Sequence, residues 1–592
     1  MAKENFFSEM EKYDLFEERA GEPPCRAGCP AGVNAAAYVA LIAQGEFNRA
    51  LDVIRQRMPF PGVCGRVCHH PCEDECSRGE YDEPVSIAAL KRAAADFGRE
   101  AERDGPILKD RGGHRVAVVG SGPAGLTAAY DLRRKGYGVT LFEKDEKAGG
   151  MIRAAIPFYR LPEEVVDRDI EDILDSGIDI RLGTEVGKDV AIRELEMYYD
   201  AVLVAVGTQK SALLNMDGVE NDRVYWGLDF LRRAKSHFPP SIGSNVLVIG
   251  GGNVAVDVAR TSLRLGAQDV TLTCIEPRDS MPAHIWEIDA ALEEGIAIRD
   301  SLGPLKIIGN EKGKVVGVEM ARAEILLDEG NTPRPQLIAE TAEIYEADTV
   351  IVAVGQTADT GFLDSTGDIG ITDRNLIEVD EITFKTGRPG LFACGDVTSG
   401  PKSIVDAVNA GHEAAESIYR YLNGMDMEKG REKIEETIPK PRDIPVYDYE
   451  RHVPQRPEAE DRKVDFREER YGLTEEEAVE EAKRCLSCGN CFVCGDECIL
   501  HITGGICPFV RCNKRMTNGP CGGAEEGLCE IDQKSECGWK QIYDQLSKHH
   551  KLDNLKETIP PRNFSYLENK YVEGSAAVIG SPRIREILKL QQ

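Results

Sequence analysis

Two stretches in the middle of the chain share one pattern of apolar and polar positions. Residues 114–144 and residues 245–276 each run from an apolar strand through a glycine-rich turn and an amphipathic helix into a second apolar strand. Strands that alternate with helices in this way form βαβ units, whose strands pair in parallel sheets. The pattern therefore predicts an α/β fold with two Rossmann-like units on one chain.

The turn of the first stretch, GSGPAG, carries Gly120, Gly122 and Gly125. In such a turn the first glycine makes the tight bend, the second lets the backbone approach a pyrophosphate, and the third lets helix and strand pack closely. Glu143 ends the next strand, 18 residues after Gly125, where a carboxylate can accept hydrogen bonds from ribose hydroxyls. This combination indicates a dinucleotide site.

The second stretch repeats the design with Gly250, Gly252 and Ala255, and Glu276 follows 21 residues after Ala255. An acidic side chain at this point hydrogen-bonds the ribose 2′-hydroxyl and repels a 2′-phosphate, so we expect NAD(H) to be preferred over NADP(H). Arg278 leaves the opposite interpretation open, because a guanidinium beside the site could bind the phosphate.

The composition argues against some classes of binding partner. The chain has 592 residues, 42% of them hydrophobic, and a net charge of −30, which predicts several domains with a large core. Such acidity argues against nucleic acid and anionic membrane surfaces, which bind lysine and arginine. No stretch reaches the roughly 18 apolar residues that span a bilayer, and the first 20 residues are too charged for a signal peptide. We therefore expect a cytoplasmic protein.

The cysteines are concentrated in two patches. Sixteen of the 18 lie between residues 25 and 76 or between residues 485 and 537. Cytosolic thiols stay reduced, so the patches favour metal ligands over disulfides. Sixteen cysteines divide into four sets of four, the number that a [4Fe-4S] cluster or a structural zinc takes. Cys274 and Cys394, which lie elsewhere, are expected as small buried residues.

These motifs resemble those of the flavin reductases with two dinucleotide domains, typified by the glutamate synthase small subunit and the large subunit of NADH-dependent ferredoxin:NADP oxidoreductase. The resemblance covers roughly residues 20–425 and includes GSGPAGL, AGG, IPFYRLP, VAVGT, GGGNVAVD, SMPAHIWEI, VAVGQT and LFACGDVTSGP. It implies FAD in the first unit and a nicotinamide cofactor in the second. Where NADPH-specific members place two arginines before the MP dipeptide, this chain has Ile275 and Glu276.

The resemblance also implies which residues hold each cofactor. FAD is expected on Gly120, Gly122, Pro123, Ala124, Gly125, Glu143, Gly149, Gly150, Arg160, Gly207, Thr208, Gly395 and Asp396. The nicotinamide cofactor is expected on Gly250, Gly252, Asn253, Val254, Ala255, Glu276, Arg278 and Gly355. Gly395 and Asp396 would reach the ribityl and pyrophosphate region of the flavin.

Two [4Fe-4S] clusters precede the FAD domain in this family, so the resemblance implies two ligand sets. The first set is Cys25, Cys76, Cys485 and Cys488, because the pair at 485 and 488 replaces a pair that the family carries before Cys25. The chain would thus fold back on its beginning. The second set is Cys29, Cys64, Cys68 and Cys72. Family members often use glutamine or glutamate as the fourth ligand near the position of Lys91, and lysine is a poor ligand, so Cys64 is chosen.

The tail holds two more sets. Cys491, Cys494, Cys498 and Cys507 resemble a ferredoxin half-motif. Cys512, Cys521, Cys529 and Cys537 lie in a stretch that resembles the cysteine-rich C-terminal domain found with methylenetetrahydrofolate reductases. Thiolates alone do not decide between zinc and iron, so we expect two to four [4Fe-4S] clusters, with one zinc as the alternative for the last set. A self-contained cluster at Cys488–Cys498, and zinc ribbons without a redox role, stay open.

Together these observations predict an N-terminal helical Fe-S domain, FAD- and NAD(P)-binding domains, a linker and a C-terminal cysteine-rich Fe-S or zinc domain. The expected ranges are 1–110 for the helical domain, 111–240 and 356–425 for the FAD domain, 241–355 for the NAD(P) domain, 426–480 for the linker and 481–592 for the tail. The linker is expected to be extended, because residues 427–470 are rich in proline and charge.

A nicotinamide stacked on a flavin exchanges hydride, and a flavin passes electrons singly to iron and sulfur. We therefore expect an FAD- and iron-sulfur-dependent NAD(P)H oxidoreductase. It would pass electrons between NAD(H) and redox subunits or a ferredoxin-like acceptor in an anaerobic complex, of the electron-bifurcating or transhydrogenase kind. The alternatives are a glutamate synthase small subunit and a docking subunit for a methylenetetrahydrofolate reductase, hydrogenase or tungsten oxidoreductase. A disulfide reductase would need a CxxC motif beside the flavin, and the second unit holds only Cys274.

Overall fold

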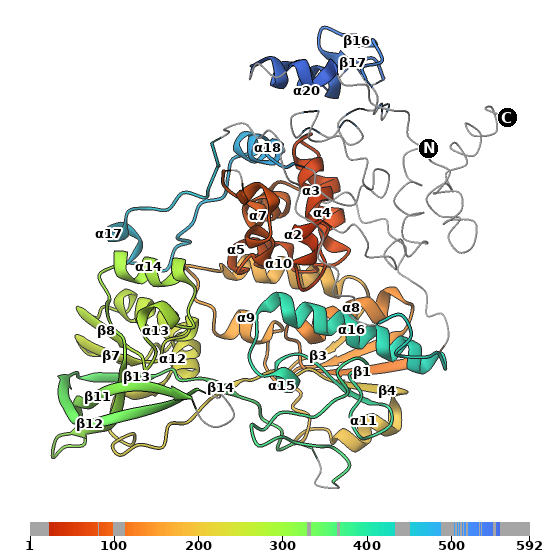
Figure 1. The fold of residues 1–592 in the computed structure, drawn as a ribbon. Helices are drawn as coiled ribbons and strands as arrows, with labels where there is room; N and C mark the ends of the chain where they lie inside the picture. The colour runs from red at the N-terminus through yellow and green to blue at the C-terminus, as the bar shows by residue number, and fades with distance from the viewer. Residues whose placement is uncertain are drawn as a thin grey trace.

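The structure is a computed structural model that describes most of the chain (Figure 1). The described residues are 23–80, 82–98, 113–327, 333–363, 367–431 and 450–486, with interrupted stretches between 503 and 556. Five predicted ligands lie outside them: Cys488, Cys491, Cys494, Cys498 and Cys507.

The first βαβ stretch opens a parallel sheet of five strands in the order β15-β4-β1-β2-β3. The strands are β1 (Arg115–Val119), β2 (Gly138–Phe142), β3 (Asp179–Arg181), β4 (Ala201–Val204) and β15 (Leu391–Ala393). The associated helices are α8 (Pro123–Arg134), α9 (Gly150–Ala154), α10 (Glu163–Leu174), α11 (Ile192–Tyr198), α15 (Asp396–Ser399) and α16 (Ile404–Leu422). The apolar run of β1 is buried on both faces, as parallel strands covered by helices require.

The second stretch opens another parallel sheet, in the order β6-β13-β7-β8-β9. Its strands are β6 (Val224–Trp226), β7 (Asn245–Ile249), β8 (Asp269–Thr273), β9 (Ala297–Arg299) and β13 (Thr349–Val352). Its helices are α12 (Gly227–Ala234), α13 (Asn253–Arg264), η2 (Arg278–Ser280) and α14 (Ile285–Glu293). The sequence analysis placed the start of the second domain at residue 241. β6 and α12 precede that residue, but they belong to the second unit because β6 pairs with β13.

Each sheet reverses its strand order at the strand that precedes the glycine turn. β1 lies between β2 and β4, and β7 lies between β8 and β13. A reversal of this kind opens a crevice at the carboxyl ends of the strands, where dinucleotides bind in doubly wound folds. The predicted α/β fold with two Rossmann-like units is therefore confirmed.

A third sheet, which the sequence analysis did not predict, is antiparallel. It consists of β10 (Leu302–Gly309), β11 (Val315–Leu327) and β12 (Pro333–Glu346), and it projects from the second unit (Figure 1). A two-stranded connection, β5 (Lys210–Ser211) with β14 (Gln356–Thr357), lies where the chain crosses between the units.

Short helices precede the first sheet and pack over it (Figure 1). They are α2 (Pro24–Ala27), α3 (Ala35–Ile42), α4 (Phe47–Arg55), α5 (Pro61–Val67), α6 (Pro71–Asp74), η1 (Ser77–Glu80) and α7 (Ile87–Phe97). One continuous cluster of buried side chains joins them to α8, α10 and α16. The same cluster takes in Ala478 and Ala482 of α18 (Glu475–Lys483), so a late segment of the chain packs on α3 and α7.

The described part of the expected linker is packed rather than free. Residues 450–470 run past the second unit and include α17 (Ala459–Arg462) (Figure 1). Arg462 and Glu469 are buried, at 6% and 4% exposure. The segment lacks regular structure outside α17, and Arg462 and Glu469 form ion pairs with the second unit instead of facing water.

The remaining described elements lie in the tail. They are β16 (Ala524–Glu525), β17 (Leu528–Cys529), α20 (Gly538–Lys548) and η4 (Leu552–Lys556). Trp539, Ile542 and Leu546 of α20 pack with Cys512 in a small apolar cluster.

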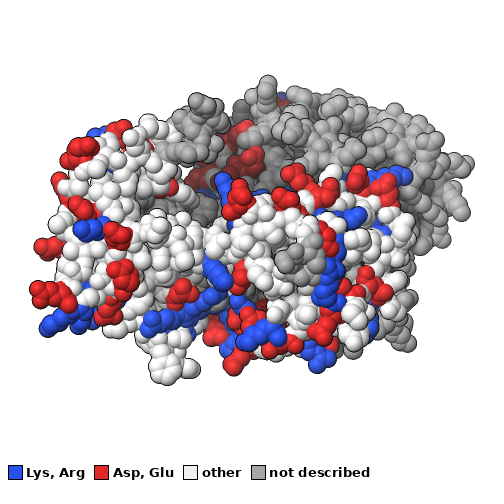
Figure 2. All heavy atoms as spheres, turned by 90° about the horizontal axis from the view of Figure 1, so that it is seen from below, with Lys and Arg blue, Asp and Glu red and all other residues white. Residues whose placement is uncertain are grey.

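On the face drawn in Figure 2, lysine and arginine lie among aspartate and glutamate. Among the described residues, none of the helices is long and apolar enough to cross a membrane.

Candidate cofactor sites and cysteine sets

The first glycine turn is built as the motif predicts. Gly120 has a φ of +102°, and a Cβ there would lie 2.6 Å from the Ala205 carbonyl oxygen. A Cβ on Gly125 would lie 2.0 Å from the carbonyl oxygen of Gly120, so helix and strand touch at this point. A Cβ on Gly122 would meet no heavy atom within 4 Å. The backbone at Gly122 is thus open to a ligand at the N-terminus of α8, where an anion is favoured.

A cleft with an empty volume of about 930 Å³ lies in front of this turn. Its walls come from both units and from the closing stretch, and they include Gly122, Gly150, Gly207, Val254, Asp257 and Gly395. The open backbone at Gly122, at the N-terminus of α8, fits the pyrophosphate of FAD. Cys394 is the one cysteine among the described residues that line the cleft, so no dithiol for disulfide chemistry lies there.

Glu143 is fixed at the end of β2 beside the turn. Its side chain is buried and accepts hydrogen bonds of 2.9 Å from the backbone nitrogens of Ser121 and Asp145. Gly149 and Gly150, with φ of +130° and +52°, bring the next loop against the turn, because a Cβ on Gly150 would lie 2.8 Å from the Gly122 Cα.

The closing stretch supplies a half-buried acid, Asp396, to the cleft wall. The Asp396 carboxylate accepts from the Lys402 backbone nitrogen at 3.2 Å and from the Thr208 hydroxyl at 3.4 Å. Burial raises the pKa of Asp396 to about 6. Gly395, which precedes it, has a φ of +77°. Pro123, Ala124 and Gly207 also line the cleft, so seven of the 13 residues expected at the FAD form its walls: Gly122, Pro123, Ala124, Gly150, Gly207, Gly395 and Asp396.

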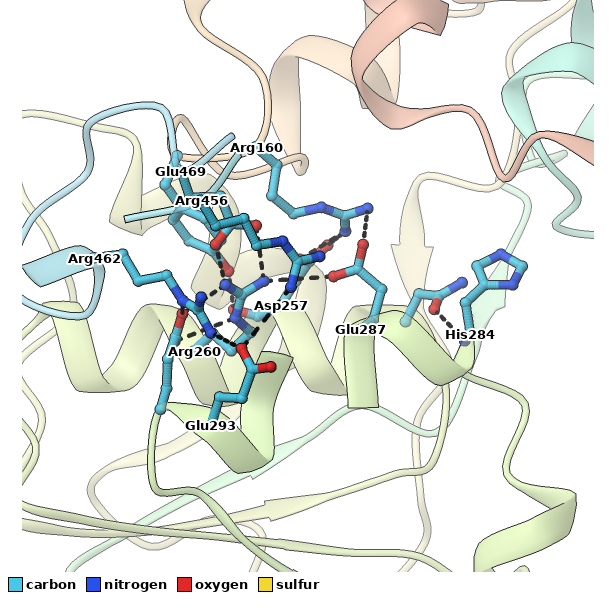
Figure 3. A network of polar contacts seen from close by, with 12 residues as sticks. Arg160, Asp257, Arg260, His284, Glu287, Glu293, Arg456, Arg462 and Glu469 are labelled. Atoms are coloured by element: carbon cyan, nitrogen blue, oxygen red, sulfur yellow. Dashed lines mark hydrogen bonds and ion pairs between the residues drawn. The ribbon is translucent and has the colours of Figure 1, made fainter. Parts of the chain in front are cut away.

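Arg160 lies behind the cleft wall, in an ion network between the two units (Figure 3). Its guanidinium lies 2.8 Å from Asp257 and 2.9 Å from Glu287, which belong to α13 and α14 of the second unit. Asp257 itself lines the cleft. The described contacts of Arg160 therefore fasten the units together, whereas the sequence assigned it to the flavin.

The network continues through the fully buried Arg260, which pairs with Glu294 at 2.6 Å and with Glu469 of the packed 450–470 segment (Figure 3). Burial opposes ionisation of Glu294, but hydrogen bonds from Arg264 and Arg260 outweigh it and lower the pKa of Glu294 to about 2. A buried charge is tolerated only when it is paired in this way. Sequence reasoning missed this network, because nothing local couples residues 260 and 469.

The second glycine turn repeats the first with one change. Gly250 has a φ of +144°, and a Cβ there would lie 2.3 Å from the Ala353 carbonyl oxygen. Gly252, like Gly122, would place a Cβ in open space. The third position is Ala255, which is fully buried. Asn253 accepts from the His284 backbone nitrogen at 3.0 Å, Val254 lines the cleft, and Gly355 has a φ of +142° beyond β13.

Glu276 and Arg278 point in different directions. A Cβ on Gly251 would lie 2.8 Å from the Glu276 carboxylate, so that carboxylate lies over the glycine turn. The Arg278 guanidinium instead donates to the Ile298 carbonyl at 2.9 Å and lies 3.8 Å from Asp300. The acid therefore faces the candidate ribose position, and the arginine is held against β9.

Three cysteines of the first predicted set line one apolar cavity. Cys25, Cys76 and Cys485 surround an empty volume of about 390 Å³, with Arg78 in the wall. The cavity is closed by contacts between early and late segments. Arg78 donates to the Arg484 carbonyl at 2.5 Å, and the Ser86 backbone nitrogen donates to Glu481 at 2.8 Å. The fourth residue of the set, Cys488, lies outside the described residues.

The second predicted set surrounds a lysine. Cys64 and Cys72 are buried, and Cys29, Cys64, Cys68 and Cys72 all interact electrostatically with Lys91, which is 3% exposed. Burial alone would lower the pKa of Lys91, but the four thiols outweigh it and raise that pKa above its ordinary value.

Aromatic rings join the loop of the second set to the second unit. His69 stacks on His284 with ring centroids 5.5 Å apart, and His70 lies 4.6 Å from Trp286. His284 and Trp286 stack on each other at 4.5 Å. The loop between Cys68 and Cys72 thus contacts the nicotinamide unit directly, which the sequence did not reveal.

No three histidine, cysteine or acidic side chains converge on a single-ion site in the described part of the chain. A [4Fe-4S] cluster binds each thiolate to a different iron, so its ligands stand farther apart than those of one ion. All four members of the second set are described, and they supply the number of thiols that such a cluster takes. In the tail, Cys512 and Cys529 are buried and Cys521 is exposed, while the Cys537 backbone nitrogen donates to Gly527 beside β17.

Three parts of this chain match known protein families. Residues 114–411 match the family described as pyridine nucleotide-disulphide oxidoreductase. Residues 19–103 match dihydropyrimidine dehydrogenase domain II, 4Fe-4S cluster, and residues 468–565 match methylene-tetrahydrofolate reductase C terminal.

Three relatives are similar over most of their length. The NADPH-Fe(3+) oxidoreductase subunit beta of Geobacter sulfurreducens is 36% identical over 78% of this chain and 75% of its own. The NADP(+)-dependent formate dehydrogenase subunit beta of Moorella thermoacetica is 38% identical over 78% and 70%. The NAD-dependent dihydropyrimidine dehydrogenase subunit PreT of Escherichia coli is 35% identical over 68% and 92%.

The fold and these matches define a flavin- and iron-sulfur-dependent pyridine nucleotide oxidoreductase. The chain belongs to the pyridine nucleotide-disulphide oxidoreductase family. The predicted resemblance, the predicted oxidoreductase function and the expected FAD, NAD(P) and [4Fe-4S] cofactors are confirmed at this level. The relatives divide between NAD and NADP(H) in their names.

Proposed function

We propose that this chain is a subunit of a larger redox complex, and that it oxidises or reduces the nicotinamide coenzyme. It would exchange electrons between NAD(H) and FAD and pass them through iron-sulfur clusters to a partner. The cleft shared by both dinucleotide units carries the proposal, because Gly122 of the first unit and Val254 and Asp257 of the second line the same space. A flavin and a nicotinamide bound to the two turns would meet there.

Within the cleft, the residues have separate tasks. We assign the pyrophosphate of FAD to the backbone at Gly122 and its ribose to Glu143, because one is open and the other is fixed beside the turn. Asp396 and Thr208 bound the opposite wall. FAD would supply the conversion between two-electron and one-electron transfer, and the apolar walls would exclude water from it.

The coenzyme of the second unit is proposed to be NAD(H). The Glu276 carboxylate over the turn would accept from a ribose 2′-hydroxyl and repel a 2′-phosphate. Arg278, the group that would favour a phosphate, is engaged by Ile298 and Asp300.

The clusters are proposed to form the exit for electrons. The cavity lined by Cys25, Cys76 and Cys485 supports the first set with Cys488 as its fourth ligand, and argues against leaving Cys485 out of a cluster. The second set is proposed to be Cys29, Cys64, Cys68 and Cys72. The tail cysteines would hold one or two more centres, with zinc as the alternative for Cys512, Cys521, Cys529 and Cys537.

The partner is proposed to be a redox subunit with its own clusters or flavin, in the cytoplasm. The similar proteins from Geobacter, Moorella and Escherichia coli are each named as subunits. The tail match to the C terminus of methylene-tetrahydrofolate reductase favours a second role, docking of such a reductase. A Cys529→Ser chain that still takes electrons from NADH but no longer co-elutes with a purified methylenetetrahydrofolate reductase would support docking by the tail.

The central experiment is anaerobic reduction of the purified full chain. NADH should bleach the flavin and then the iron-sulfur absorbance, and NADPH should do so at least about tenfold less efficiently. Iron and acid-labile sulfide should exceed eight per chain if both N-terminal sets and one tail set are filled, since each [4Fe-4S] cluster holds four of each. Protein that contains flavin but no iron, or that NADPH reduces faster, would contradict the proposal.

A further inference from the structure

Lys91 is buried beside the second cysteine set and forms no ion pair with an acid among the described residues. It belongs to α7, and lysine is almost never fully buried unpaired. The groups that attract its charge most strongly are the four cysteines of the set. The ammonium therefore lies buried close to sulfur.

Close backbone packing fixes this placement. A Cβ on Gly65 would lie 2.6 Å from the Arg92 Cα, so α5 and α7 touch at the positions next to Cys64 and Lys91. On the other side, the Ala88 backbone nitrogen donates to Glu73 at 2.8 Å, which ties the start of α7 to α6 next to Cys72. Helices on both sides of Lys91 thus hold cysteines against it.

Among the described residues that line the cavity of the first set, the cation is Arg78, which is paired with Asp82 at 2.6 Å and also donates to the Arg484 carbonyl. Lys91 has no such ion pair in the described part of the chain, although Glu73 and Asp169 lie near cysteines of its set.

We propose that Lys91 is a positioning residue that raises the reduction potential of the second cluster. The inference rests on the proposed ligand set. An ammonium carries no lone pair and three N–H donors, so it cannot replace a ligand but can donate to sulfur. Each reduction adds one electron to the cluster, from the flavin in the working protein, and no bond is made or broken. A fixed buried cation stabilises that added negative charge.

The test is a potentiometric titration of the anaerobic full chain, followed by the electron paramagnetic resonance signals of the reduced clusters. Lys91→Met removes the charge, and Lys91→Arg keeps it. We expect the potential of one cluster to fall in Lys91→Met by at least a tenfold change in its reduction equilibrium, which is about 59 mV for a one-electron couple. The other clusters serve as internal standards and should keep their potentials.

Each outcome decides the proposal. Lys91→Met with full iron content and an unchanged potential would overturn it, and so would equal shifts in Lys91→Met and Lys91→Arg, which would mean that packing rather than charge is responsible. If Lys91→Met loses iron, Lys91→Gln takes its place under the same criteria. Wild-type protein without a second cluster signal would instead refute the ligand assignment, so the two failures are distinguishable.

Discussion

The two dinucleotide units use the same turn but leave different room at its third small residue. In the first unit a Cβ on Gly125 would lie 2.0 Å from the Gly120 carbonyl, whereas the second unit holds Ala255 there with its Cβ 3.3 Å from the position of a Cβ on Gly250. The first helix therefore lies closer to its strand. Both glycine turns therefore follow the same backbone path. The room between helix and strand decides whether the third position of the turn must be glycine or can be alanine.

The largest expected difference is at this position. Gly125→Ala should abolish FAD binding and destabilise the first unit, because the new methyl group would overlap a backbone carbonyl that cannot move freely. The flavin-to-protein absorbance ratio of the purified chain measures the loss. Ala255→Gly is the matched control and should retain flavin, with a cost of at most about 1 kcal/mol for a glycine in a helix. Equal flavin content in both variants would show that the two turns are equivalent.

Glu143 and Glu276 end equivalent strands but differ in how firmly they are held. Glu143→Gln should raise the dissociation constant of FAD about 10–100-fold, since a hydrogen bond to a charged group contributes about 1.5–3 kcal/mol. Flavin titration of the apoprotein measures it. Glu146→Gln, on an exposed neighbour, should change nothing. A similar loss in both variants would attribute the effect to overall charge.

A smaller effect is expected at the second unit. Glu276→Gln should lower the ratio of kcat/KM for NADH over NADPH about tenfold, because repulsion of the 2′-phosphate disappears, and a tenfold ratio corresponds to about 1.4 kcal/mol. Steady-state reduction of an artificial acceptor gives both constants. Arg278→Met should leave the ratio nearly unchanged, since its guanidinium is bound to Ile298 and Asp300. A large change in Arg278→Met would reverse the assignment.

The smallest expected effect is the pH response of the apoprotein. The pKa of Asp396 is raised to about 6 by burial, so its protonated form is favoured in the folded state. Its contribution to stability is full below about pH 4 and is lost as the pH rises through about 6. Asp396→Asn should therefore raise the melting temperature by a few degrees at pH 7, at about 2–4 °C per kcal/mol, and leave it unchanged at pH 4.

In the second unit, Glu294 behaves in the opposite way. Its pKa is lowered to about 2, so its contribution is full above about pH 4.5 and is lost as the pH falls through about 2. Glu294→Gln should lower the melting temperature at pH 7. If Asp396→Asn and Glu294→Gln shift it in the same direction at pH 7, the assignment of these two acids is wrong.

The sequence predicts those features that depend on contacts within one βαβ unit. The turns at Gly120 and Gly250 follow from strand and helix periodicity, and the preference for small residues follows from backbone contact within one βαβ unit. The meeting of Cys25 with Cys485 followed from the family resemblance, and the structure brings both to one cavity.

Other features depend on contacts that no local pattern encodes. The ion pairs of Arg160 with Asp257 and Glu287 join residues that lie about a hundred positions apart in the chain. The hairpin of β11 and β12 and the burial of Glu469 likewise depend on the tertiary arrangement. In the sequence, Lys91 lies near a position where family members often carry a cluster ligand, and lysine is a poor ligand. Its proposed role depends on the four cysteines that lie near it in the fold.

The cavity of the first cysteine set has a consequence for biogenesis. Cys76 leaves the ribosome long before Cys485, and at about 5–20 residues per second the interval is on the order of tens of seconds. During that time Cys25 and Cys76 are exposed thiols without their partners. Iron in the proposed first set can therefore be held by all its ligands only after nearly the whole polypeptide has been synthesised, so we expect a truncated product to lack a finished first cluster.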